Sequence, residues 1–158
     1  MGVQMTDRRK LSIRIARNKK ERETAFRIRS AVFVKEQKVP VRLEIDEYDK
    51  DAKHTIMYCS GKPMGCARVV FRGGVAKLGR IAILKRYRGM GFGKAMLGYL
   101  VRYCKRRKAG RIVLGAQLRS VDFYRKSGFV PHGKVFMDAG IRHVGMHLDT
   151  AAREKAGR

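Results

Sequence analysis

The chain of 158 residues has few acidic residues, few cysteines and no long apolar run, and each shortage excludes a class of protein. Its three cysteines, Cys59, Cys66 and Cys104, are odd in number and show no Cys-x-x-Cys spacing. This pattern predicts reduced thiols in or near a core rather than a disulfide framework. His143 and His147 have a plausible spacing for zinc, but no cysteine pair accompanies them, so we expect no metal.

No apolar run reaches the roughly 20 residues that a membrane-spanning helix needs, and no secretory signal is visible. We therefore expect a cytoplasmic protein with no membrane partner. The length and the 44% hydrophobic content are typical of one folded domain. We place this domain at residues 10–149, between a flexible leader at 1–9 and a basic tail at 150–158.

Acidic residues are scarce and unevenly placed. Against 38 lysines and arginines there are only 13 acids, which gives a formal net charge of +25. None of these acids lies between Ala52 and Val121, whereas six lie between Glu36 and Asp51. The excess charge predicts non-specific binding to nucleic acid that weakens with salt. The acidic segment has two interpretations that stay open: a solvated, exposed loop, or an anionic patch that attracts a positively charged amine.

Hydrophobic periodicity and turn residues predict the order strand, helix, three strands, helix, strand, short helix and two strands. Such an order indicates an α/β (α+β) fold with a mixed, mostly antiparallel sheet flanked by helices. The expected ranges are 11–16, 21–34, 55–59, 64–71, 78–84, 91–108, 111–116, 121–127, 129–132 and 141–148.

A glycine-rich loop joins the expected strand at 78–84 to the expected helix at 91–108. It reads Arg-Gly-Met-Gly-Phe-Gly-Lys from Arg88 to Lys94. Unpaired backbone N–H groups at the positive end of a helix dipole bind phosphate oxygens, and glycines leave these amides accessible. The loop is not a P-loop, because Gly-x-x-x-x-Gly-Lys-Ser/Thr does not occur. A dinucleotide fingerprint is disfavoured because the third glycine and the following acid are missing. A short pyrophosphate cradle or a structural turn remains.

The sequence Arg88-Gly-Met-Gly91-Phe-Gly93 resembles the Arg/Gln-x-x-Gly-x-Gly/Ala acyl-CoA signature of the GNAT acyltransferase superfamily. The predicted order of elements is similar to the GNAT fold over residues 11–148. Four stretches resemble the YjcF/ElaA-like branch of that superfamily, at 32–40, 44–54, 123–129 and 136–143. This branch usually carries Glu at the position of Asp138 and Pro at that of Arg142, so the identity of the acceptor is left open.

The resemblance implies an acetyltransferase with acetyl-CoA as cosubstrate and the primary amine of a small molecule or peptide as acceptor. It implies that the amides of the glycine-rich loop hold the pyrophosphate, and that an exposed strand pairs with the pantetheine arm. That pairing requires the neighbouring strand at 112–116 to splay away, and an N–H near Ile83 would then polarise the thioester carbonyl. The implied cofactor-binding residues are Ile81, Ala82, Ile83, Arg88, Gly89, Met90, Gly91, Phe92, Gly93, Lys94 and Tyr124.

Tyr124 matches the family tyrosine beside the CoA sulfur, where a phenol protonates the departing thiolate. The general base is not fixed, because Gly79 and Arg80 stand where many family members carry a glutamate. The candidates for the base are Glu36, Glu44, Asp46, His54 and His143, and with Tyr124 we take Glu44, His54 and His143 as the catalytic set. The alternative function is a catalytically silent GNAT-fold protein that binds nucleic acid or ribosomes through its basic surface. A monomer and a homodimer are both compatible with the sequence.

Overall fold

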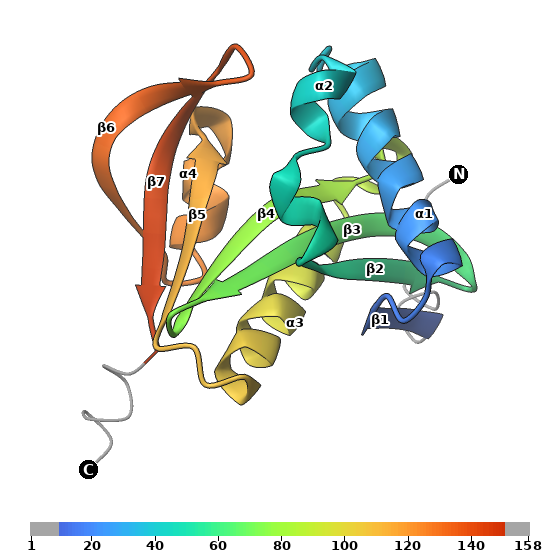
Figure 1. The fold of residues 1–158 in the computed structure, drawn as a ribbon, viewed down its shortest axis with the longest axis horizontal. Coiled ribbons are helices and arrows are strands. Elements are labelled where there is room, and N and C mark those ends of the chain that lie inside the picture. Colours follow the sequence, from blue (N-terminus) through green and yellow to red (C-terminus); the bar gives the residue numbers. More distant parts are fainter. Residues whose placement is uncertain (1–9, 151–158) are drawn as a thin grey trace.

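The computed structural model describes residues 10–150, so the predicted leader and all but the first residue of the predicted tail lie outside the described part. A seven-stranded sheet with the order β1-β2-β3-β4-β5-β7-β6 forms the centre of the molecule (Figure 1). All neighbouring strands are antiparallel except β4 and β5. The strands are β1 (Leu11–Ile15), β2 (Lys53–Cys59), β3 (Lys62–Arg72), β4 (Val75–Ile83), β5 (Arg111–Gln117), β6 (Val130–Asp138) and β7 (Ile141–Asp149).

Helices cover both faces of this sheet. The helices α1 and α2 lie on one face and α3 lies on the other (Figure 1). None of the helices in the described part of the chain is long and apolar enough to cross a membrane. The helical segments are α1 (Lys19–Arg29), the π-helical η2 (Ser30–Glu36), α2 (Val41–Glu44), the 3₁₀ turns η3 (Glu47–Lys50), η4 (Lys85–Tyr87) and η5 (Leu118–Ser120), α3 (Phe92–Arg106) and α4 (Val121–Arg125).

Two hydrophobic cores hold the helices to the sheet. On one face, Met96, Leu97, Leu100 and Cys104 of α3 are fully buried against the strands, at the spacing that one helical face requires. On the other face, Ala25, Ile28 and Val32 pack against Ile56, Cys66 and Ala82. The three cysteines are buried and none forms a disulfide within the described part of the chain, as the sequence predicts.

The predicted fold class is confirmed: the chain forms a mixed, mostly antiparallel sheet with helices on both faces. The first helix differs in detail, because its α-helical part ends at Arg29 and the chain continues as π-helix to Glu36. The expected exposed acidic loop over residues 44–51 is wrong for two of its members. Glu44 and Asp49 are only 3% and 8% exposed, because arginines from other elements reach them.

Candidate active site

The parallel strands β4 and β5 separate halfway along their length. They pair at Val75–Arg111, Ala76–Ile112 and Lys77–Val113, and no further pair follows. At this point Gly79 faces Arg68 on β3 and Ala82 faces Cys66, so two residues of β4 oppose one residue of β3. Such a bulge bends a strand, and Arg80 within it has φ +52°. The divergence that the family resemblance implies is therefore present in the structure.

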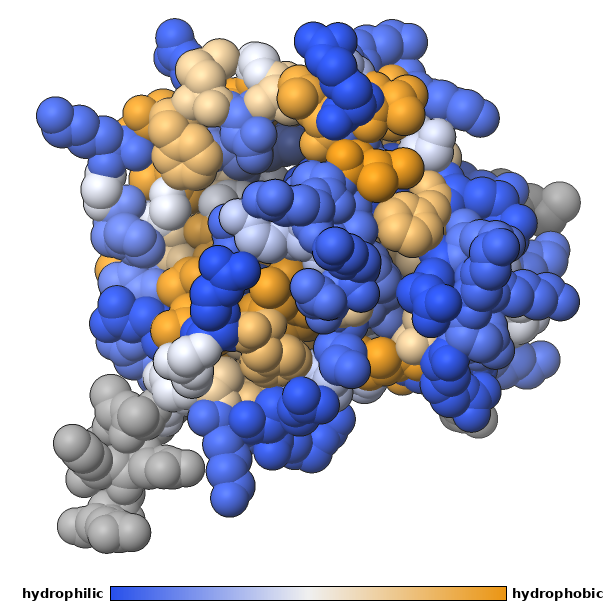
Figure 2. All heavy atoms as spheres, in the orientation of Figure 1, coloured by the Kyte–Doolittle hydropathy of each residue, from blue (hydrophilic) through white to orange (hydrophobic). Residues whose placement is uncertain are grey.

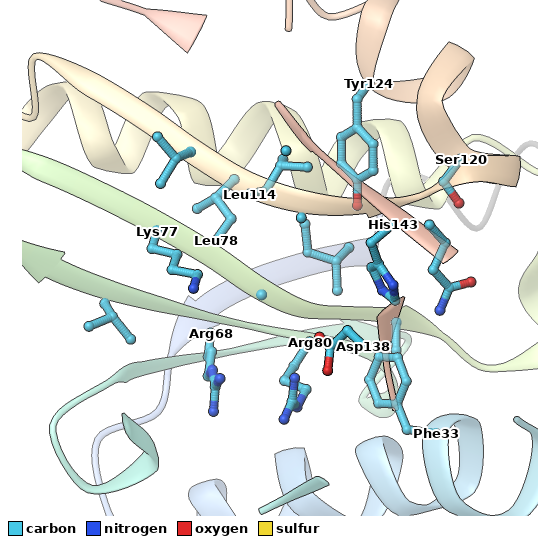
Figure 3. A pocket seen from close by; sticks show the side chains of 18 of the residues that line it. Phe33, Arg68, Lys77, Leu78, Arg80, Leu114, Ser120, Tyr124, Asp138 and His143 are labelled. Atoms are coloured by element: carbon cyan, nitrogen blue, oxygen red, sulfur yellow. The ribbon is translucent and has the colours of Figure 1, made fainter. Parts of the chain in front are cut away.

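A cleft of about 1100 Å³ occupies the gap. Residues of β4, β5, β7, α4 and the segment around α2 line it, and they include the predicted Ile81, Ala82, Ile83, Arg88, Tyr124 and His143. Figure 3 shows Tyr124, His143 and Phe33 at one end of the cleft and Lys77 and Arg68 towards the other. The cleft is thus long, and its two ends carry different chemistry.

The backbone at the end of β4 faces the gap. The N–H of Leu84 donates to the carbonyl of Met64 in β3, at an N···O distance of 2.9 Å. Because successive residues of a strand direct their polar groups to opposite edges, the N–H and C=O of Ile83 face away from β3 and towards the cleft. The Ile83 carbonyl accepts a hydrogen bond from Nε of Arg88 at 2.9 Å. The Ile83 N–H is therefore directed at the gap, where the family resemblance expects the pantetheine arm.

The glycine-rich loop leads directly into α3. Gly89 and Gly91 have φ +76° and +84°, and Gly91 caps the helix without any side-chain hydrogen bond to the first amides. A Cβ at Gly89 would meet no atom within 4 Å, so the strand-to-helix turn is open above its backbone. Phe92 is 3% exposed and belongs to the core, so only its backbone is available to a ligand. This open turn at the start of a 15-residue helix fits a pyrophosphate.

An ion pair fixes the first residue of the loop. Arg88 donates to both carboxylate oxygens of Glu36, with N···O distances of 2.7 and 2.8 Å. These hydrogen bonds lower the pKa of Glu36 below its ordinary value. Glu36 therefore stays ionised and tied to Arg88, which suits a positioning residue better than a general base.

Tyr124 lies in the cleft wall beside Phe123 and Phe129, with ring centroids 5.0 and 6.0 Å away. Burial among these rings raises the pKa of Tyr124 to about 12, because the phenolate would be poorly solvated. The hydroxyl is consequently protonated at neutral pH and able to donate a proton within the cleft.

The ring of His143 has a defined tautomer. Its Nδ1 lies 2.7 Å from the carbonyl oxygen of Ile141, and a carbonyl only accepts hydrogen bonds. Nδ1 therefore carries the proton, and in the neutral ring Nε2 keeps a free lone pair. The ring is also stacked on Phe136 at 5.7 Å. Of the predicted base candidates, His143 alone combines a place in the cleft wall with an unshared basic atom.

His54 and Glu44 lie elsewhere. The His54 ring is 2% exposed, packs against Phe26 and hydrogen-bonds through Nε2 to the backbone oxygen of Asp49 at 2.8 Å. Burial lowers the pKa of His54. Glu44 is 3% exposed, and its Oε1 lies 2.5 Å from Nε of Arg29. Both side chains are occupied by structural partners, and we propose neither as the base.

Glu44 belongs to an arginine–carboxylate network that the sequence interpretation missed. Each of its three acids is matched by a guanidinium, so the segment carries little net charge. Burial would raise the pKa of Asp46, but hydrogen bonds from Arg68 outweigh this and hold it below its ordinary value. The ion pairs are Arg29–Glu44, Arg29–Asp49, Arg68–Asp46, Arg68–Asp49, Arg80–Glu44 and Arg80–Asp46. One signal was available: Arg29 directly follows Ile28 on the buried side of α1.

Comparisons with known proteins identify the family of the chain. Residues 16–150 match the family model described as "Acetyltransferase (GNAT) domain". The chain is 40% identical over 136 residues to the uncharacterized N-acetyltransferase YjcF of Bacillus subtilis. The aligned region covers 85% of this chain and 97% of that relative. It is 27% identical to the protein ElaA of Escherichia coli, over 77% of this chain and 82% of that relative.

Solved structures show the same fold. The crystal structure of Escherichia coli ElaA superposes with a TM-score of 0.79 and covers 88% of this chain and 99% of that chain, at 23% identity. A Bacillus subtilis acetyltransferase in complex with CoA superposes with a TM-score of 0.67 at 18% identity, covering 89% of this chain and 99% of that chain. Sequence, fold and comparisons together place the chain in the GNAT acetyltransferase family, in its YjcF/ElaA-like branch.

Proposed function

We propose that the protein transfers an acetyl group from acetyl-CoA to a primary amine by direct attack of the amine on the thioester. One observation carries the proposal: Arg88 at the start of the glycine-rich loop, Ile83 with its outward backbone and Tyr124 all line the cleft between β4 and β5. The CoA complex of a structural neighbour supports the choice of cosubstrate.

The binding residues have separate roles in this proposal. The amides from Gly89 to Lys94 would hold the pyrophosphate, and the helix dipole of α3 adds to the attraction. The exposed edge of β4 at Ile81 and Ile83 would pair with the amides of the pantetheine arm, as an added strand does. Arg88 would keep the strand end and the loop in place through its hydrogen bonds to Ile83 and Glu36.

Bound acetyl-CoA supplies an acyl carbon activated as a thioester. The Ile83 N–H is directed so that it can donate to the acyl oxygen, where negative charge develops. Nε2 of His143 is the atom that accepts a proton from the attacking nitrogen, directly or through water. As the C–N bond forms and the C–S bond breaks, the Tyr124 hydroxyl donates its proton to the departing sulfur.

Release of free thiol from acetyl-CoA, measured with and without an added amine, tests this function. Replacing Tyr124 by Phe removes the proton donor and keeps the ring, so kcat should fall about 100-fold or more while the Kd of acetyl-CoA stays within about twofold. Tyr99→Phe is the matched control, because Tyr99 lies on α3 and stacks on Tyr103 outside the cleft. Equal turnover by both variants would remove the acid role.

The catalytically silent alternative would give a different result, because such a protein would bind RNA and release no thiol with any amine. A cytoplasmic location, a monomeric or homodimeric state and salt-sensitive nucleic-acid binding stay predictions from the sequence.

A further inference from the structure

Three cations surround one aromatic ring at the end of the cleft remote from Tyr124. The guanidinium carbons of Arg68 and Arg72 each lie 5.9 Å from the centre of the Tyr48 ring, and Nζ of Lys77 lies 6.0 Å from it. All four residues line the cleft. We call this group the distal cation cluster; Figure 3 shows two of its members, Lys77 and Arg68, near each other.

Two of these cations have no acidic partner. Arg68 is neutralised by Asp46 and Asp49, at 2.6 and 2.9 Å. Arg72 and Lys77 are exposed, and neither forms an ion pair with any residue from 10 to 150. Their positive charge is therefore available to a ligand in the cleft.

The rest of the cleft does not offset this charge. Six lysines and arginines line it, but three of them, Arg68, Arg80 and Arg88, are paired with acids. Among the described residues this leaves Arg72, Lys77 and Arg119 in the lining, against the single unpaired acid Asp138. Asp46 is itself held by Arg68 and Arg80. A concave surface with such an imbalance concentrates anions and repels cations. Three acids of the acidic segment, Glu44, Asp46 and Asp49, are paired with arginines, so they add little net negative charge to the cleft.

Apolar side chains lie between the two ends. Leu78 and Leu114 line the cleft between Lys77 and Tyr124 (Figure 3), and Phe136 lines it beside His143. Figure 2 shows apolar side chains gathered over α2 and over the β6–β7 side, on a face that is otherwise mostly hydrophilic. An alkyl or other apolar linker suits this middle part.

We propose that the acceptor is an elongated primary amine that carries a carboxylate or phosphate at its other end. Arg72 and Lys77 bind the anion beside Tyr48, and the amine lies between His143 and the acyl carbon. Lys77 pairs with Val113 of β5 and His143 pairs with Gln117 of the same strand. Val113 and Gln117 are four residues apart, which is about 13 Å at roughly 3.3 Å per residue. The anion is thus held too far from the amine for a short α-amino acid such as glycine. This inference rests on the proposed acetyl transfer.

A series of amines with the same six-carbon chain tests the inference on the full-length chain. The acceptors are 6-aminohexanoate, 6-aminohexyl phosphate, hexylamine and 1,6-diaminohexane, each assayed by thiol release from acetyl-CoA. We expect kcat/KM for the better anionic acceptor to exceed that for hexylamine about tenfold or more, because hydrogen bonds to charged groups are strong. 1,6-Diaminohexane should be the poorest acceptor. The ranking of carboxylate against phosphate identifies the anion.

The double variant Arg72→Gln and Lys77→Gln should lower the ratio of kcat/KM for the anionic acceptor to that for hexylamine about tenfold. Arg22→Gln with Lys62→Gln removes the same charge from exposed positions outside the cleft and should keep the ratio. Transfer to hexylamine or 1,6-diaminohexane that equals transfer to the anionic acceptors would overturn the inference and leave the proposed function standing. An unchanged ratio in the Arg72/Lys77 variant would do the same. Absence of thiol release with every amine would refute the proposed function, and this inference with it.

Discussion

Replacing Asp49 by Asn is expected to destabilise the protein strongly, because two buried guanidinium groups share its carboxylate. Its oxygens accept from Arg29 at 2.6 and 3.1 Å, from Arg68 at 2.9 Å and from the backbone N–H of Asp46 at 3.0 Å. Arg29 is 1% exposed and Arg68 is 7% exposed, so water cannot replace the lost partner. Breaking a buried pair from one side costs about 3–5 kcal/mol.

This loss of free energy is large compared with the total free energy of unfolding of a domain. Domains of this kind unfold with a free energy of about 5–15 kcal/mol, so the variant should lose roughly a fifth or more of its stability. For a chain of this length, the expected decrease in Tm is roughly 6–20 °C. Urea unfolding at pH 7, followed by circular dichroism, measures the change as a lower midpoint with an unchanged slope.

The effect should depend on pH with a definite sign. Burial opposes ionisation of Asp49, but the hydrogen bonds from Arg29 outweigh it, and the pKa of Asp49 falls far below the ordinary value of 3.8. A carboxyl with a depressed pKa stabilises the fold above its unfolded-state value, and this contribution is lost as the pH falls towards its folded-state value. The difference in the free energy of unfolding between the wild-type protein and the Asn variant should therefore be fully present above about pH 5 and shrink below about pH 4.

Glu47→Gln is the matched control, because Glu47 is an exposed acid of the same segment with no ion pair to any described residue. Its stability should change by less than about 0.5 kcal/mol. If Asp49→Asn and Glu47→Gln unfolded at the same urea concentration, the reasoning about the arginine–carboxylate network would be wrong.

Two further variants test the cofactor loop and the base. Gly89→Ala should cost about 1–2 kcal/mol of stability, because φ is +76° there, and should also weaken binding of acetyl-CoA in calorimetry. Gly73→Ala carries a similar strain in the β3–β4 turn, at φ +56° and with open space around it, so it should leave the Kd of acetyl-CoA unchanged; equal effects of both variants on that Kd would count against the loop. His143→Gln should lower kcat about 100-fold and leave the Kd of acetyl-CoA within about twofold, because it removes the proton acceptor and not the cofactor loop. A variant with the kcat of the wild-type protein would exclude His143 as the base.

Most of the fold was predictable because local patterns and the core agree. The alternation at 11–16 is strand β1, and the helical spacing of Leu97, Leu100 and Cys104 is the buried side of α3. The glycine-rich loop was recognisable for the same reason: adjacent residues form it, and its positive φ angles need glycine. Such features depend on short stretches of chain, so they can be predicted from the local sequence alone.

The acidic segment was misjudged because its partners come from distant parts of the chain. Glu44 and Asp49 look solvated beside Asp46, Glu47 and Asp51, and only the packed structure brings Arg29 of α1 and Arg68 of β3 to them. Once these ion pairs form, three of the acids contribute little net charge, and Arg72 and Lys77 stay unpaired among the described residues at the remote end of the cleft. The proposal of an anionic acceptor therefore depends on contacts between residues about 20 positions apart.

By itself the sequence determined the order of elements, the family, the glycine-rich loop and the buried cysteines, because each of these follows from neighbouring residues and periodic burial. Only the tertiary structure decided where β4 leaves β5, which of the candidate bases lines the cleft with an unshared basic atom and which acids are paired with arginines. These depend on strand register, a bulge and ion pairs between separate elements, and no local pattern of residues encodes such long-range geometry.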